Sequence, residues 1–229
     1  MKLLGALERP YYALVRPPVN ALIRAGVRPN TITTVGTGFV LLSAIAYGMG
    51  HVRWGGALLL VSGVVDTLDG QVARGGAMET RFGAFYDSTI DRVGDGATFI
   101  GLGVYLMTAP DVFWRLPAVI LCMVAILVSL LVSYARARAE GLGIDCKVGI
   151  AQRAERIILL GLVSLAFGSA GQNLPLEIAV LLLVAASTIT VVQRFVYVYR
   201  VTSGPERPPE TPRPTLADSP ALESLSKGR

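Results

Sequence analysis

The stretch that decides the fold is Asp66-Thr-Leu-Asp69-Gly70-Gln-Val-Ala73-Arg74, followed after eight residues by Gly83-Ala-Phe-Tyr-Asp87-Ser-Thr-Ile-Asp91. It joins two apolar runs, and 6 of the chain's 16 acidic residues lie between Asp66 and Asp95. Acids within or beside membrane-spanning segments are costly, so they indicate a functional site. The two acids of each half are three or four residues apart, so each pair shares one helix face. Two adjacent antiparallel helices could therefore point four carboxylates into one space.

Four carboxylates this close together would repel one another and take up protons unless a cation compensated them. Hard divalent cations such as Mg²⁺ and Mn²⁺ prefer carboxylate oxygens and commonly serve phosphate-bearing substrates. Gly70 and Gly83 leave room beside the acids, and Arg74 is suited to a phosphate. The alternatives are surface ion pairs with Arg74, Arg81 or Arg92, and a metal-ion channel or transporter. Transport leaves the glycine and arginine positions unexplained.

Working outward, the composition indicates a membrane protein. The chain has 229 residues, of which 52% are hydrophobic and 16% charged, against about 25% charged in ordinary soluble domains. Its apolar runs approach the length of about 20 residues that a helix needs to cross a bilayer. Soluble enzymes, disulfide scaffolds and disordered proteins are therefore excluded, and we expect an all-α integral membrane protein. Six transmembrane helices are predicted, over residues 33–49, 54–67, 82–107, 116–134, 157–169 and 174–197.

The two ends of the chain differ in composition from this middle part. Residues 1–29 interleave basic side chains with short apolar stretches, which favours an N-terminal amphipathic helix on the membrane surface over a signal peptide. From Ser203 onward the chain holds 6 of its 13 prolines and has no apolar periodicity, as is typical of a disordered tail. We therefore expect a membrane domain over residues 1–202 and a disordered cytoplasmic tail over 203–229.

The basic residues predict the orientation in the membrane. With six spans, three short turns lie on the side opposite the termini, and they hold only Arg53 and Arg115 of the 21 Lys and Arg residues. The positive-inside rule then places both termini and the acidic motif at the cytoplasmic face. We expect a multi-pass protein of the cell (plasma) membrane. Its net charge of +5 points to phosphates rather than to nucleic acid.

At the acidic motif, the sequence resembles the CDP-alcohol phosphotransferases, also called CDP-alcohol phosphatidyltransferases. Their signature is Asp-x₂-Asp-Gly-x₂-Ala-Arg-x₈-Gly-x₃-Asp-x₃-Asp, and each fixed position matches here. The resemblance implies two divalent metal ions, Mg²⁺ or Mn²⁺, bound by Asp66, Asp69, Asp87 and Asp91. It also implies that Asp91 is the general base, that CDP-diacylglycerol donates a phosphatidyl group with release of CMP, and that the protein is a homodimer.

The same resemblance places the start of the first span over the nucleotide. Taken alone, Asn30 or Thr31 is an N-cap whose backbone N–H groups could face an anion, or a cap with no other role. The resemblance implies that residues at the start of this span and residues in and after the acidic motif contact the CDP-lipid. These are Asn30, Thr31, Ile32, Thr33, Gly70, Arg74 and Thr80.

A second polar cluster suggests an anionic acceptor. It comprises residues 133–140, 152–156 and 193–194, and arginines beside a metal site suit a phosphorylated alcohol. Anchoring to lipid phosphates is the alternative. The candidate acceptor contacts are Arg136, Arg153, Arg156 and Arg194.

These stretches resemble those of phosphatidylinositol phosphate synthases, which implies inositol 1-phosphate as acceptor. In those enzymes lysine is usual where Arg136 stands, and Glu and Pro are usual where Gln152 and Ala154 stand. The alternative acceptor is glycerol 3-phosphate, giving phosphatidylglycerol phosphate, or the alcohol of another member of the family. Asp95 is left open, either as a support for the metal ligands or as a partner of Arg92.

Overall fold

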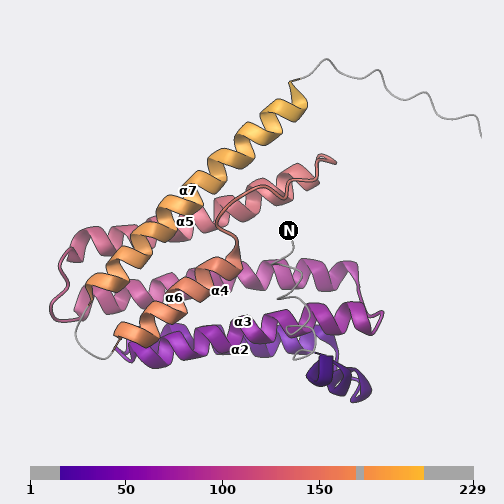
Figure 1. The fold of residues 1–229 in the computed structure, drawn as a ribbon, viewed down its shortest axis with the longest axis horizontal. Coiled ribbons are helices and arrows are strands. Elements are labelled where there is room, and N and C mark those ends of the chain that lie inside the picture. Colours follow the sequence, from indigo (N-terminus) through magenta and orange to yellow (C-terminus); the bar gives the residue numbers. More distant parts are fainter. Residues whose placement is uncertain (1–15, 169–172, 204–229) are drawn as a thin grey trace, which may run out of the picture.

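The computed structural model describes residues 16–168 and 173–203, and every regular element within them is a helix (Figure 1). Within the predicted surface helix of 1–29, residues 16–24 are helical. The part of that prediction before residue 16 lies outside the described residues. The predicted tail also lies outside them from residue 204. The all-α prediction is confirmed for the described residues. The helices that follow are α2 (Pro29–Gly48), α3 (Val52–Gly75), α4 (Arg81–Thr108), α5 (Arg115–Glu140), α6 (Arg153–Phe167) and α7 (Leu174–Thr202).

Each predicted span coincides with one helix, but most of the helices extend beyond the apolar run into polar sequence. The run predicted over 54–67 is part of α3, which continues to Gly75, and the run over 116–134 is part of α5, which continues to Glu140. α6 begins at Arg153, four residues before its apolar run. These extensions place the acidic motif and part of the basic cluster on helices rather than on loops.

Among the described residues, four helices are long and apolar enough to cross a membrane: α2, α3, α5 and α7. α4 has 28 residues, but it carries five charged side chains between Arg81 and Asp95. α6 has only 15 residues, or about 22 Å of helix at 1.5 Å per residue, against a hydrocarbon core of about 30 Å. The chain is thus a multi-pass membrane protein by the length and composition of its helices.

α2 is the element that relates the two acidic helices, because it packs against both α3 and α4. The approach to α4 is close: a Cβ atom on Gly101 would lie 2.1 Å from the carbonyl oxygen of Ala44. α3 packs in turn against α6, and there a Cβ on Gly56 would lie 2.8 Å from the carbonyl oxygen of Gly161. Small residues allow such backbone contacts between helices. The carboxyl end of α3 and the amino end of α4 therefore lie near each other and near the start of α6.

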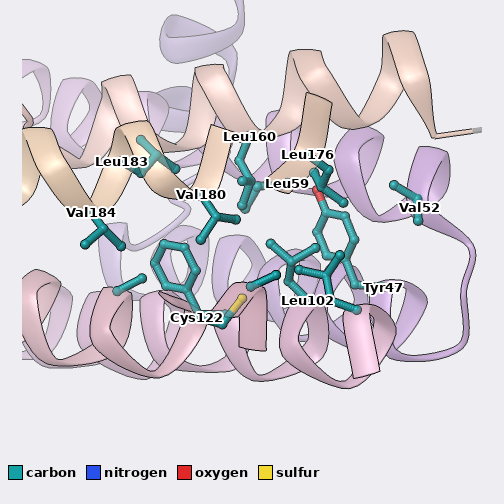
Figure 2. Close-up of a cluster of buried hydrophobic side chains, with 14 of the residues drawn as sticks. Tyr47, Val52, Leu59, Leu102, Cys122, Leu160, Leu176, Val180, Leu183 and Val184 are labelled. Atoms are coloured by element: carbon teal, nitrogen blue, oxygen red, sulfur yellow. The ribbon is translucent and has the colours of Figure 1, made fainter. Parts of the chain in front are cut away.

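A buried apolar cluster fills the other end of the bundle (Figure 2). Tyr47 and Leu102 are fully buried in it, and the thiol of Cys122 lies among the aliphatic side chains. The hydroxyl of Tyr47 is 2.7 Å from that of Ser164, which gives this buried polar atom a partner. Tyr47, Cys122 and Ser164 come from the ends of their helices remote from the acidic motif, and the cluster continues from there to Ile157 near the start of α6. The apolar contacts thus hold one end of the bundle together, and polar side chains gather at the opposite end.

Candidate metal and phosphate site

Three carboxylates meet where α3 and α4 face each other. One oxygen each from Asp66, Asp69 and Asp87 lies within 4.8 Å of the other two. Asp69 is 7% exposed, and the hydroxyl of Thr33 on α2 donates a hydrogen bond of 2.7 Å to its Oδ2 atom. The donor set consists of carboxylate oxygens, which suits a hard divalent cation. The structure therefore brings together three of the four aspartates of the motif as a possible metal site.

The fourth aspartate, Asp91, lies next to this group and faces arginines. Its Oδ1 atom is 2.9 Å from Nη1 of Arg153 on α6, and the same nitrogen is 2.5 Å from Oδ2 of Asp66. Its Oδ2 atom is 3.2 Å from Nη2 of the neighbouring Arg92. A single guanidinium thus bridges an aspartate of α3 and an aspartate of α4.

Asp95, whose role the sequence left open, is paired with α6. Its Oδ2 atom is 2.5 Å from Nη2 of Arg156, and its Oδ1 atom is 3.6 Å from Nε of Arg153. Both Asp95 and Arg156 are buried, whereas Arg92 pairs with Asp91. Among the described residues, Nε and Nη1 of Arg156 are buried without a hydrogen-bond partner. Arg156 therefore retains donor capacity beyond its bond to Asp95.

A first cavity of about 220 Å³ lies between the start of α2, the end of α3 and the start of α4. Five of the seven residues predicted to contact a CDP-lipid line it, whereas Thr31 and Ile32 are not among the lining residues. Ile32 instead packs with Val19 and Val72. The lining residues are Pro29, Asn30, Thr33, Asp69, Gly70, Ala73, Arg74, Met78, Glu79, Thr80, Gly83, Ala84 and Asp87.

The start of α2 differs from the prediction. Arg28 is the N-cap and makes no side-chain capping bond, so the assignment of Asn30 or Thr31 as N-cap was wrong. The physical reason is Pro29, because proline lacks the N–H that a first-turn residue would leave unpaired and its fixed φ suits the N1 position. Asn30 is consequently in the first turn of the helix and lines the cavity.

The start of α4 also shapes this cavity. The hydroxyl of Thr80 accepts a hydrogen bond of 2.9 Å from the backbone N–H of Gly83 and so caps the helix. A Cβ atom on Gly83 would lie 2.9 Å from Oγ1 of Thr80 and 3.1 Å from Oδ1 of Asn30, so a side chain there would crowd both groups. Met78 and Glu79 line the cavity as well but were not predicted. Their only signal was the fixed length of the eight-residue spacer that contains them.

A second cavity of about 510 Å³ adjoins the first on the side of α5, α6 and α7. All four arginines predicted to contact the acceptor line it, and Arg136 is paired there with Glu140 at 2.8 Å. Ser88 and Ser133 add hydroxyl groups to its wall. The lining residues are Ala84, Asp87, Ser88, Asp91, Arg92, Val132, Ser133, Arg136, Ala137, Glu140, Gln152, Arg153, Ala154, Arg156 and Arg194.

Arg194 lines this cavity while being fixed by backbone groups. The side chain is 4% exposed, and its Nε donates a hydrogen bond of 2.9 Å to the carbonyl of Val148. Its Nη1 donates to the carbonyl of Val132 on α5. Arg194 therefore connects α7 to α5 and to the segment between α5 and α6, and it places a positive charge at the cavity wall.

The two cavities share part of their wall. Ala84 and Asp87 line both of them, so one cavity with motif residues and one cavity with arginines meet at a carboxylate of the metal group. Such an arrangement can bring two phosphate-bearing molecules to one cation.

A family model described as CDP-alcohol phosphatidyltransferase matches residues 27–203, a range that contains all four aspartates and both cavities. This chain belongs to the CDP-alcohol phosphatidyltransferase family. The resemblance inferred from the acidic motif is confirmed. The chain is therefore a transferase of the CDP-alcohol phosphatidyltransferase type.

Two named relatives are similar to this chain over most of its length. The phosphatidylinositol phosphate synthase of Mycobacteroides abscessus is 37% identical over 192 residues, which is 83% of this chain and 86% of that protein. The archaetidylinositol phosphate synthase of Methanothermobacter thermautotrophicus is 42% identical over 166 residues, which is 72% of this chain and 80% of that protein.

Solved structures of a phosphatidylinositol phosphate synthase are similar to this one. Phosphatidylinositol phosphate synthase of Mycobacterium tuberculosis with CDP-DAG bound has a TM-score of 0.74 and 32% identity, covering 86% of this chain and 98% of that chain. The same enzyme in complex with manganese and citrate has a TM-score of 0.74 and 31% identity, covering 85% and 93%. That manganese complex, together with the three clustered aspartates here, supports binding of a divalent metal.

Proposed function

We propose that this protein transfers a phosphatidyl group from CDP-diacylglycerol to inositol 1-phosphate, giving phosphatidylinositol phosphate and CMP. The observation that carries the proposal is the pair of cavities that meet at Asp87, one lined by the family motif and the other by arginines. Two relatives that differ in the lipid they are named for share inositol phosphate in their names. This shared headgroup favours the same acceptor for this chain.

The first cavity is the proposed site of the CDP-lipid. Arg74, which lies against Gly70, is suited to a phosphate of the donor as a fixed positive charge. Because the cavity joins the metal group at Asp69 and Asp87, the diphosphate can reach those carboxylates through a cation. The proposed contacts remain Asn30, Thr31, Ile32, Thr33, Gly70, Arg74 and Thr80, although two of these residues do not line the cavity.

The carboxylate group fits a divalent metal by its chemistry. Its donors are oxygens, and in the described part of the chain neither Asp69 nor Asp87 has an ion-pair partner. We propose that two Mg²⁺ ions, replaceable by Mn²⁺, are held by Asp66, Asp69, Asp87 and Asp91. When bound, such ions neutralise negative charge on the diphosphate and on the leaving group.

The second cavity is the proposed acceptor site. Arg136, Arg153, Arg156 and Arg194 supply positive charge for the phosphate of the acceptor. We propose that Asp91 takes the proton of the acceptor hydroxyl, whose oxygen then forms a bond to the lipid-side phosphorus of the donor. The bond from that phosphorus to the bridging oxygen of the diphosphate breaks, and CMP leaves with that oxygen.

The placement in the membrane completes the proposal. Six crossings, by α2 to α7, put the acidic motif and both cavities at the cytoplasmic face of the plasma membrane, where the basic residues are concentrated. The short α6 crosses with the help of its flanks or by local thinning of the bilayer. Residues 1–202 form the membrane domain with an amphipathic surface helix at its start, residues 203–229 form a disordered cytoplasmic tail, and the working unit is a homodimer.

An acceptor panel tests this function. Purified protein, CDP-diacylglycerol and Mg²⁺ are incubated with inositol 1-phosphate, inositol or glycerol 3-phosphate, and CMP release is measured. Of the three acceptors, we expect only inositol 1-phosphate to cause CMP release. We expect the Asp69→Asn variant to lose this CMP release. Asp111→Asn is the matched control, because Asp111 lies in the turn between α4 and α5, remote from the metal group. Release with glycerol 3-phosphate alone would identify a phosphatidylglycerol phosphate synthase instead.

A further inference from the structure

Arg153 occupies a position that two proposed metal ligands need. Its Nη1 atom lies 2.5 Å from Oδ2 of Asp66 and 2.9 Å from Oδ1 of Asp91. Because Arg92 faces the other oxygen of Asp91 at 3.2 Å, both oxygens of that carboxylate are in contact with arginines. A cation that binds Asp91 in this conformation therefore meets a guanidinium at either oxygen and has to displace it or share that oxygen with it.

The three-carboxylate group does not have this conflict. Asp69 and Asp87 belong to it without an arginine partner among the described residues. Asp66 contributes an oxygen to the group, although its Oδ2 atom contacts Arg153. One cation can thus be bound while Arg153 stays in place. A second cation that requires Asp91 has to compete with the guanidinium for the same oxygens.

Arg153 also has an alternative destination. It is the first residue of α6, and it lines the second cavity together with Arg136, Arg156 and Arg194. Its Nε has no hydrogen-bond partner among the described residues and lies 3.6 Å from Asp95. A guanidinium released from the aspartates would remain within the cavity, where an anionic ligand could accept its hydrogen bonds.

Resting on the function proposed above, we propose that Arg153 is an exchangeable counter-ion that couples the second metal ion to the acceptor. It neutralises Asp66 and Asp91 while the second ion is absent and turns to the acceptor phosphate when that ion enters. The second ion and the phosphate then favour each other, and the coupling is reciprocal because binding free energies are linked. The metal site consequently becomes complete when the acceptor is present.

Mn²⁺ binding measures this coupling without catalysis. The purified full chain is titrated with Mn²⁺ in the absence of donor lipid, with and without inositol 1-phosphate, and free Mn²⁺ is followed by electron paramagnetic resonance. The wild type should show one tight site and one weaker site that inositol 1-phosphate strengthens. In Arg153→Gln the weaker site should be tighter without the phosphate by about 5- to 150-fold, the usual range of such coupling, and its response to inositol 1-phosphate should shrink.

Matched variants separate competition from general electrostatics and from misfolding. Arg136→Gln removes a charge from the same cavity, but Arg136 pairs with Glu140 and not with the four aspartates, so the second site should change little when inositol 1-phosphate is absent. Arg153→Lys keeps the charge but loses the planar fork, so its second site should have an affinity between those of the wild type and Arg153→Gln. Binding of a soluble CDP compound confirms that each variant is folded.

The Mn²⁺ titrations and the acceptor panel can fail independently of each other. An unchanged or weaker second site in both Arg153 variants, or equal strengthening in Arg136→Gln, would overturn the coupling even if CMP release is normal. Conversely, failure of the acceptor panel would refute the proposed transfer while a Mn²⁺ site that is tighter in Arg153→Gln would still support the exchange by Arg153.

Discussion

Replacing Arg156 with alanine should weaken acceptor binding more than any other step. The side chain is 5% exposed and donates to Asp95 alone among the described residues, leaving Nε and Nη1 buried and unpaired. Since the side chain lines the second cavity and not the first, we expect its guanidinium to bind the acceptor phosphate and not the nucleotide.

The size of the effect follows from the bond that is lost. Hydrogen bonds to charged groups contribute about 1.5–3 kcal/mol each, and about 1.4 kcal/mol corresponds to a factor of ten. Loss of one such bond should therefore raise the KM for inositol 1-phosphate by about 10- to 150-fold. The KM for CDP-diacylglycerol should change little. In Arg156→Lys, the KM for inositol 1-phosphate should lie between those of the wild type and Arg156→Ala, because lysine keeps the positive charge but lacks the planar guanidinium fork.

Steady-state CMP release, measured with each substrate varied in turn, checks this prediction. The matched control is Lys147→Ala, which removes a positive charge from the segment between α5 and α6; Lys147 is an exposed partner of Asp145 and does not line the cavity. An unchanged KM for the acceptor, with donor binding weakened instead, would show that Arg156 does not face the acceptor.

Three further changes test other parts of the account. Asp91→Asn should lower CMP release by at least about 100-fold, the usual minimum for a general base, while a CDP compound still binds; normal turnover would remove Asp91 from that role. Thr33→Val removes the 2.7 Å hydrogen bond to Asp69 and should weaken Mn²⁺ binding about 10- to 100-fold, as calorimetry can measure; unchanged affinity would contradict this. Glu177→Ala deprives the backbone N–H groups of Phe113 and Trp114 of their buried acceptor and should lower stability by about 3 kcal/mol, seen as a lower midpoint of thermal unfolding; an unchanged midpoint would show that water replaces the carboxylate.

The acidic motif could be predicted from the sequence because its information is local. The spacing of Asp66 and Asp69, and of Asp87 and Asp91, determines which side chains share a helix face, and the apolar runs on either side predict helices. The structure has both pairs on helices α3 and α4. By contrast, the apolar run over 157–169 does not show how far α6 extends toward Arg153, because apolar content cannot show which of the flanking polar residues are helical.

The pairing of charges across helices could not be predicted in this way. Arg153 and Asp66 are 87 residues apart in sequence, and the helix packing that brings them together depends on contacts such as that of Gly56 with α6. The sequence offered Arg92 as a partner of Asp95 because the two are near in the chain. The three-dimensional packing instead gives Asp95 to Arg156. The arginine cluster was thus recognised as a set, but the contacts of its individual members depend on tertiary structure.

In the proposed reaction, the acceptor enters the lipid product together with its phosphate. Inositol 1-phosphate carrying ³H in the ring and ³²P in the phosphate tests this directly with CDP-diacylglycerol, Mg²⁺ and purified protein. We predict that the lipid product contains both labels in the ratio of the starting acceptor, and that one CMP is released for each product molecule. A lipid that contains ³H without ³²P, or CMP release with neither label in the lipid, would contradict it.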